Sequence, residues 1–225
     1  MNPTEITVAD ALAARSTSAI LLDTLREDIL HGRLKPGDRV LQDAVATRFG
    51  VSQTVAREAF RDLVQEGFLM AEPRRGVSVA SMSAEEADEI TQLRSRIEPQ
   101  ALAWAIPRMT PAVIDAAEKI LKELDKARTV NQIILLNARF HQTLYAPAAR
   151  ARTLAMVETL RLGFERYLRF TWESTSHLEQ SQKEHIELLR LCRAGAVDKA
   201  CEMLRKHITA TGTQLIESLK ARGDA

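Results

Sequence analysis

One short segment constrains the fold of this chain more than any other: FGVSQTVAREAFRD, which begins at Phe49. Leu41 and Val45 precede Phe49 at four-residue spacing, which places the three side chains on one face of a helix. Gly50 suits the left-handed conformation that ends a helix, and the Ser52 hydroxyl can accept a hydrogen bond from the first turn of the next helix. The segment therefore predicts two helices joined by a short turn.

The second of these helices is predicted to begin at Gln53 and to end at Gln65 or Glu66. Its apolar residues share one face, which we expect to be buried: Ala56, Ala59, Phe60 and Leu63. Polar residues occupy other faces near its N-terminal half. This is the arrangement of a helix-turn-helix, in which the second helix enters the major groove of DNA. The residues expected to contact DNA from this helix are Gln53, Thr54, Val55, Arg57 and Arg61.

Two short apolar runs follow the second helix and predict a β-hairpin. They cover residues 68–70 and 77–79, and the turn between them reads Pro-Arg-Arg-Gly. Two guanidinium groups project from this turn, so we expect further DNA contacts at Arg74, Arg75 and Gly76. An amphipathic helix is also predicted over residues 18–30. Together these elements predict a winged helix-turn-helix domain at residues 17–80, after a flexible N-terminus at residues 1–16.

The region from Leu30 to Ala80 is similar, nearly end to end, to the DNA-binding domain of GntR-family bacterial regulators. The resemblance rests on a Gly-x-Leu-x-Pro-Gly run, a Val-Ser pair, an Arg-Glu-Ala triplet and an Arg-Gly pair, at residues 32–37, 51–52, 57–59 and 75–76. A single winged module reads only a few base pairs, whereas a two-fold dimer reads a palindrome. The resemblance therefore implies a homodimer on a palindromic double-stranded DNA operator.

Two residues of the second helix depart from the family pattern. The family usually has Arg where this chain has Gln53, and Pro or Thr where it has Val55. Arg pairs with guanine through two hydrogen bonds, whereas Gln pairs with adenine. Our hypothesis is that the operator of this protein carries adenine where relatives require guanine.

Overall composition gives little support to DNA binding. Lys and Arg total 31 against 30 for Asp and Glu, a net charge of +1, so only the placement of basic residues near the turn and the wing favours DNA. No apolar run of about 18 residues and no signal-peptide pattern is present, which predicts a cytoplasmic protein with no membrane partner. The chain has only 2 cysteines, which predict no disulfide framework.

A second domain is predicted at residues 83–222, where Ser83-Ala84-Glu85-Glu86 resembles a capping box at the start of a helix. Glycine is rare in this region and no alternating strand pattern occurs. The predicted helices cover residues 84–106 with a kink at Pro99, 111–128, 130–145, 150–171, 177–193 and 196–221. The expected fold is therefore mainly α, with an N-terminal winged helix-turn-helix and a C-terminal all-α bundle. The resemblance to GntR-family regulators implies that this bundle binds an effector and dimerises.

His141, His185 and His207 lie on the predicted inner faces of three different helices, and Asn137 lies one turn before His141. Imidazoles from three helices can converge in a bundle and bind a divalent metal ion. For each histidine taken alone, a core residue bonded to a neighbour is the commoner role.

The same residues resemble the FCD ligand-binding domain of the FadR subfamily. Residues 137–141 look like its Asp-x-x-Phe-His motif, and His185 and His207 fall where that domain has its later histidines. The resemblance implies a zinc or nickel ion held by Asn137, His141, His185 and His207, with a small organic acid as effector. The family has Asp where this chain has Asn137, and a neutral amide is a poorer metal ligand than a carboxylate.

Arg94 lies in a segment similar to the Leu-Arg-x-x-Leu-Glu sequence at the start of the FCD domain. A guanidinium binds a carboxylate through two charge-assisted hydrogen bonds, so Arg94 is the expected effector-binding residue. The alternative is a pair between Arg94 and Glu98 on a solvated helix face. Further candidates for the cavity wall are Arg161, Tyr145 and Trp104.

These patterns predict a ligand-responsive DNA-binding transcriptional regulator, expected to be a repressor rather than an enzyme. Two alternatives stay open: a regulator whose helical domain only dimerises, and a metalloenzyme built on the three histidines. No His-Glu-x-x-His segment supports the enzyme.

Overall fold

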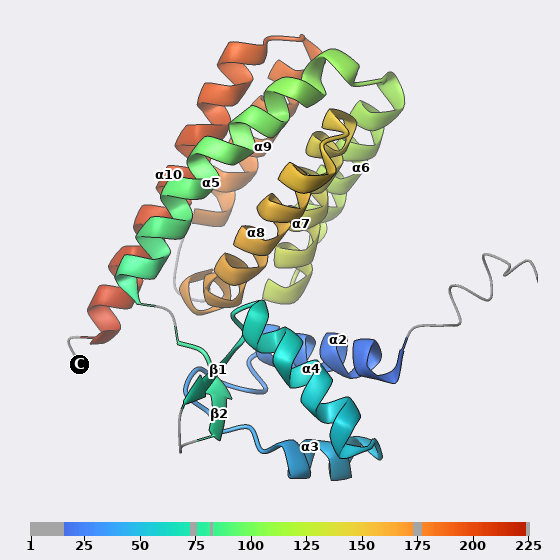
Figure 1. Cartoon of the computed structure of the whole chain (residues 1–225). Coiled ribbons are helices and arrows are strands. Elements are labelled where there is room, and N and C mark those ends of the chain that lie inside the picture. The colour runs from blue at the N-terminus through green and yellow to red at the C-terminus, as the bar shows by residue number, and fades with distance from the viewer. Residues whose placement is uncertain (1–15, 73–75, 82, 173–176, 224–225) are drawn as a thin grey trace, which may run out of the picture. The chain divides into compact units, whose positions relative to one another are not determined.

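The computed structural model describes residues 16–72, 76–81, 83–172 and 177–223. The chain divides into two compact units between residues 81 and 82, and Figure 1 shows the elements of each. Most of the predicted flexible N-terminus, residues 1–15, lies outside the described residues. Among the described ranges, no helix combines the length and the apolar character that crossing a membrane requires.

The N-terminal unit consists of helices followed by an antiparallel hairpin. The elements are α2 (Thr17–Leu30), α3 (Gln42–Phe49), α4 (Gln53–Gln65), β1 (Leu69–Glu72) and β2 (Gly76–Val79). The strands pair in the register Leu69 to Val79. The predicted winged helix-turn-helix fold is confirmed, since a hairpin follows directly on the helix pair.

Local chemistry explains the turn between α3 and α4. Gly50 adopts the left-handed conformation with φ of 63°, where other residues would be strained. The Ser52 hydroxyl accepts a hydrogen bond from the Val55 amide at 3.3 Å and caps α4. The predicted apolar face of α4 is the buried one: Ala56, Ala59, Phe60 and Leu63.

A third segment pairs with the hairpin, and we did not predict it from the sequence. Arg39 bridges to Ser78 in antiparallel fashion, and the Val79 amide donates to the Asp38 carbonyl at 2.8 Å. The segment that connects α2 to α3 therefore runs along β2. This pairing occupies one edge of the small sheet and fixes the Arg39 backbone beside the wing.

The C-terminal unit is helical throughout its described ranges. Its elements are α5 (Ala84–Ala105), η1 (Ile106–Arg108), α6 (Pro111–Lys126), α7 (Val130–Tyr145), η2 (Ala146–Ala148), α8 (Ala151–Trp172), α9 (His177–Arg193) and α10 (Val197–Gly223). The predicted helices lie within two residues of these bounds. The two short 3-10 turns were not predicted. Thr110 precedes α6, and within the described ranges its side chain forms no capping hydrogen bond.

One buried apolar cluster joins these helices. Phe140 and Leu144 of α7 meet Leu188 of α9 and Leu204 of α10. The Cys201 thiol donates to the Pro99 carbonyl at 3.2 Å and so ties α10 to α5. Cys192 is buried and unpaired, and burial raises the pKa of its thiol to about 12. Both cysteines therefore serve as packing residues.

Helices α5 and α10 lie side by side (Figure 1) because one glycine permits a close approach. A Cβ atom added to Gly212 of α10 would overlap the Thr91 side chain of α5. The Thr91 hydroxyl is itself fixed by a hydrogen bond to the Ala87 carbonyl at 2.7 Å. Gly212 therefore sets the distance between the two helices.

Candidate functional site

The exposed side of α4 carries the residues expected to contact DNA. Gln53, Thr54, Arg57 and Arg61 are exposed, and Val55 is half-buried. The Arg61 Nε lies 3.4 Å from a carboxylate oxygen of its neighbour Asp62. The Gln53 amide nitrogen donates to Asp43 of α3 at 2.7 Å. The structure thus presents a row of polar and basic groups at the N-terminal half of α4.

Three arginines bear on the prediction of DNA contacts at the wing. Arg74 and Arg75, the predicted contacts at its tip, lie outside the described residues. Gly76 is exposed and begins β2 with φ of 89°. The Arg39 guanidinium lies 3.9 Å from the position that a Cβ on Gly76 would occupy. We did not single out Arg39 from the sequence, because only strand pairing with Ser78 brings it to the wing.

In the C-terminal unit the structure brings the three predicted histidines together. His141 of α7, His185 of α9 and His207 of α10 are all buried, and one nitrogen from each lies within 4.8 Å of the others. The ring centroids of His185 and His207 are 4.7 Å apart. The convergence predicted from three separate helix faces therefore occurs.

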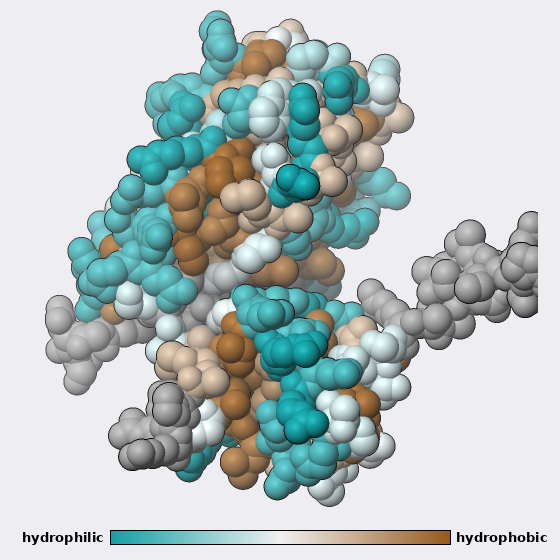
Figure 2. Space-filling model, in the orientation of Figure 1, coloured by the Kyte–Doolittle hydropathy of each residue, from teal (hydrophilic) through white to brown (hydrophobic). Residues whose placement is uncertain are grey.

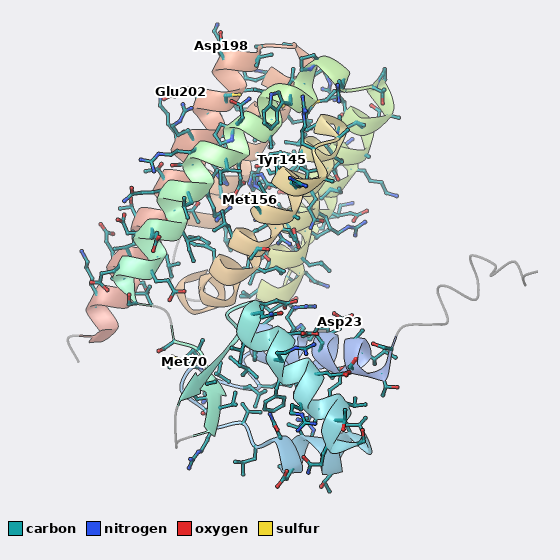
Figure 3. The ribbon with its side chains drawn as sticks, viewed as in Figure 1. Asp23, Met70, Tyr145, Met156, Asp198 and Glu202 are labelled. Carbon is teal, nitrogen blue, oxygen red and sulfur yellow. The ribbon has the colours of Figure 1, made fainter. Side chains whose placement is uncertain are left out.

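Hydrogen bonds to neighbouring side chains define which nitrogen carries the proton in two of the rings, His207 and His141. The His207 Nδ1 donates to a carboxylate oxygen of Glu184 at 2.7 Å. The Tyr145 hydroxyl, inside the bundle (Figure 3), donates to Glu98 at 2.8 Å. The His141 Nδ1 lies 3.1 Å from the same hydroxyl oxygen and must donate to it. The Nε2 atoms of His141 and His207 are therefore unprotonated when these rings are neutral, and the lone pair of the His207 Nε2 faces the His185 Nε2 at 3.2 Å.

Burial keeps two of the rings neutral. Burial, followed by the neighbouring imidazoles, holds the pKa of His141 well below its usual value. Burial and then His207 hold the pKa of His185 well below its usual value. The Tyr145 phenol keeps its proton because burial and then Glu98 raise its pKa well above the usual value. Neutral imidazoles are the form that binds a metal ion.

The geometry of the cluster fits a divalent metal ion. The Nε2 atoms of His185 and His207 are 3.2 Å apart, and two nitrogen ligands of a tetrahedral zinc ion are separated by about 3.3 Å. The His185 Nδ1 is buried and has no hydrogen-bond partner in the described part of the chain. A carboxylate behind a ligating histidine, as Glu184 stands behind His207, fixes the ring and increases its basicity.

Asn137 and Arg94 line a small cavity beside the cluster, together with His141, His207 and Glu165. Its volume is about 20 Å³, enough for about one water molecule. A separate cavity of about 490 Å³ reaches Asn137 and His185 from the side of α6 and α9. Its wall combines apolar side chains (Leu124, Ala127, Ile133, Leu178 and Ile186) with polar and charged ones, among them Asp125, Glu179 and Lys183.

The surroundings of Arg94 agree in part with each of the two roles expected from the sequence, effector binding and pairing with Glu98. Its Nε donates to Glu98 at 2.6 Å, so the pair expected as the alternative does form. The pair is not on a solvated face, because Arg94 is 8% exposed and Glu98 is 0% exposed. The Arg94 guanidinium also lies over the Phe164 ring, at 4.8 Å from its centroid. Arg94 is therefore a buried cation at the edge of the histidine cluster.

A second buried ion pair lies nearby on α8. Arg161 pairs with Glu165, and both are buried. Burial raises the pKa of the Glu165 carboxyl, and Arg161 opposes that rise. We did not predict from the sequence that Glu165 lies beside the histidine cluster. Trp104 was a candidate for the cavity wall, but its ring lies at the surface, 36% exposed, under the Arg150 guanidinium.

The two units define the class of protein. A helix pair and hairpin with a polar recognition face form a winged DNA-binding module, and a separate helical unit carries a buried histidine cluster. The sequence model named "Bacterial regulatory proteins, gntR family" matches residues 17–79, and that of the FCD domain matches residues 89–210. This chain therefore belongs to the GntR family of bacterial regulators and carries an FCD domain.

Relatives agree with this assignment. The chain is 30% identical over 202 residues to the HTH-type transcriptional regulator YdhC of Bacillus subtilis (strain 168), covering 87% of this chain and 88% of YdhC. It is 27% identical over 205 residues to the HTH-type transcriptional repressor GlaR of Escherichia coli (strain K12), covering 82% and 89%. The solved structure of E. coli McbR/YncC matches with a TM-score of 0.75 and 25% identity, covering 92% and 98%.

Proposed function

We propose that this GntR-family regulator is a repressor that binds a palindromic operator as a homodimer and that a metal ion and a small carboxylate in the helical unit control its affinity for DNA. The observation that carries this proposal is the histidine cluster. Three buried rings from three helices converge, and two of them, His207 and His141, direct their Nδ1 protons to Glu184 and Tyr145. Such an arrangement is costly to bury unless a ligand uses it.

His141, His185 and His207 would hold the metal ion, and zinc or nickel suits three imidazoles. Asn137 would lie beside it as a neutral oxygen donor. When bound, the ion would supply positive charge and an open coordination position for an anion. Because Asn137 replaces a carboxylate, the site is one unit more positive than the family pattern and favours an anionic effector.

The effector is proposed to be an organic acid with an apolar body. The cavity beside the histidines is too small for more than about one water molecule. The larger cavity of about 490 Å³ shares Asn137 and Ser181 with it and has apolar side chains in part of its wall, among them Leu124, Ile133 and Leu178. A carboxylate near Asn137 could reach the metal ion and Arg94, while its apolar part fills the larger cavity.

A face of α5 and α8 is the proposed dimer surface. Leu93 of α5 is 38% exposed and Met156 of α8 is 55% exposed. Figure 2 shows apolar side chains gathered over these two helices. An exposed apolar surface of this kind commonly marks a protein interface. A two-fold axis there would give each dimer two DNA-binding modules.

A metalloenzyme is a weaker reading. The relatives are named as transcriptional regulators, and the cavity in contact with both His141 and His207 has room for about one water molecule. A substrate would therefore need the site to open.

Selection of bound sequences from random double-stranded DNA tests the proposal. We expect the full-length protein to enrich an inverted repeat with half-sites about one helical turn apart. Arg57→Ala should weaken binding to that repeat by about tenfold or more at constant salt. Arg139→Ala, which removes an exposed arginine of the helical unit, is the matched control and should leave binding unchanged. Enrichment of no repeated sequence would contradict the proposal.

A further inference from the structure

The start of the recognition helix is connected to the helix before it by a side-chain hydrogen bond. Gln53 is the first residue of α4, and Asp43 lies in the first turn of α3. The Gln53 amide nitrogen donates to an Asp43 carboxylate oxygen at 2.7 Å. The backbone between them is fixed by the left-handed Gly50 and by a hydrogen bond from the Val51 amide to the Ala46 carbonyl at 3.0 Å.

This bond determines how the Gln53 amide is oriented. An ionised carboxylate can only accept hydrogen bonds, so the NH₂ group of Gln53 must face Asp43 and the carbonyl oxygen must face away. A free glutamine amide can turn over and exchange the two ends. The bond to Asp43 excludes the reversed orientation and leaves one N–H and the carbonyl oxygen of Gln53 for another partner.

The remaining groups of Gln53 match one base. In the major groove adenine offers the N7 acceptor beside the N6 donor, which an amide N–H and oxygen satisfy together. Guanine offers two acceptors there, N7 and O6. The Gln53 oxygen would face one of these acceptors without a hydrogen bond. A fixed amide therefore discriminates between the two bases more strongly than a rotating one.

We infer that Asp43 is a positioning residue for base recognition: it orients the Gln53 amide so that this protein selects adenine at one position of each operator half-site. The inference rests on the proposed operator binding and adds a second residue to its specificity. Asp43 need not touch the base. Its negative charge also lies near the DNA surface, where it disfavours all sequences equally.

The test compares operators with adenine or guanine at the position read by Gln53. That position is the one at which Gln53→Ala loses base preference. Asp43→Ala should reduce the preference for adenine by about two- to tenfold, because Gln53 must then be ordered on binding. Asp43→Asn keeps an acceptor oxygen and should retain most of the preference. In a Gln53→Ala background, Asp43→Ala should change nothing further in base preference.

Affinity for unrelated DNA distinguishes the effect of Asp43 on the orientation of Gln53 from the effect of its negative charge. Both Asp43→Ala and Asp43→Asn remove the negative charge and should raise affinity for all sequences to a similar extent. An unchanged adenine preference in Asp43→Ala would overturn the inference. Failure to obtain any operator would instead refute the proposed function.

Discussion

Alanine at both His141 and His207 is expected to lower the affinity of the protein for zinc by at least about 100-fold, because removal of a group that merely supports a ligand already costs about 10- to 100-fold. The double variant retains only His185 of the three imidazoles in the cluster. The measurement is competition with a chromophoric chelator at neutral pH, where His141 and His185 are neutral because burial holds the pKa of each well below its usual value.

The matched control for this experiment is His31→Ala, which removes an imidazole from the N-terminal unit. It should bind zinc like the native protein. Circular dichroism should show that all three proteins are equally helical. If the double variant bound zinc as tightly as the native protein, the metal ion would lie elsewhere and the cluster would be a group of core histidines.

Gly212→Ala is expected to destabilise the helical unit by a net amount of about 1–2 kcal/mol, since overpacking typically costs about 1–3 kcal/mol and this contact is among the closest. The added methyl group would overlap the Thr91 side chain of α5. Thr91 has a β-branched side chain and a fixed hydroxyl, so it cannot easily turn aside. The better helix propensity of alanine, about 1 kcal/mol, offsets only part of this cost. Chemical denaturation followed by circular dichroism measures the difference.

Gly163→Ala in α8 is the matched control, because its new methyl group would meet Ile90 at an ordinary 3.7 Å. It should be neutral or stabilising. Combining Gly212→Ala with Thr91→Ala should recover much of the lost stability. Equal stabilities for Gly212→Ala and Gly163→Ala would show that α5 and α10 can separate at little cost.

Features governed by local sequence were predictable. Gly50 and Ser52 mark the turn between α3 and α4 through their own backbone and hydrogen-bonding preferences. The buried face of α4 follows from the spacing of its apolar residues. The inward direction of His141, His185 and His207 follows from the same periodicity, because a buried face recurs at every turn of a helix.

Features that depend on how distant segments pack were not predictable. Periodicity places His207 and Glu184 on their helices, but only the packing of α9 against α10 brings them within 2.7 Å. The same holds for the bond from Tyr145 to Glu98. For Arg94, the sequence offers a pair with Glu98 as the alternative to effector binding, and it does not show that the shared face is buried. Arg39 reaches the wing only through its pairing with Ser78.

Binding of a metal ion and a carboxylate to the helical unit is expected to change operator affinity. The most direct test measures operator binding by fluorescence anisotropy at constant salt. It compares metal-free protein, protein with zinc, and protein with zinc and citrate as a carboxylate probe. We predict that operator affinity differs by at least about fivefold between two of these states, and that the operator changes ligand affinity by the same factor. The variant with alanine at His141 and His207 should show no such difference. Equal operator affinity of the native protein in all three states would contradict the claim and leave a helical unit that only dimerises.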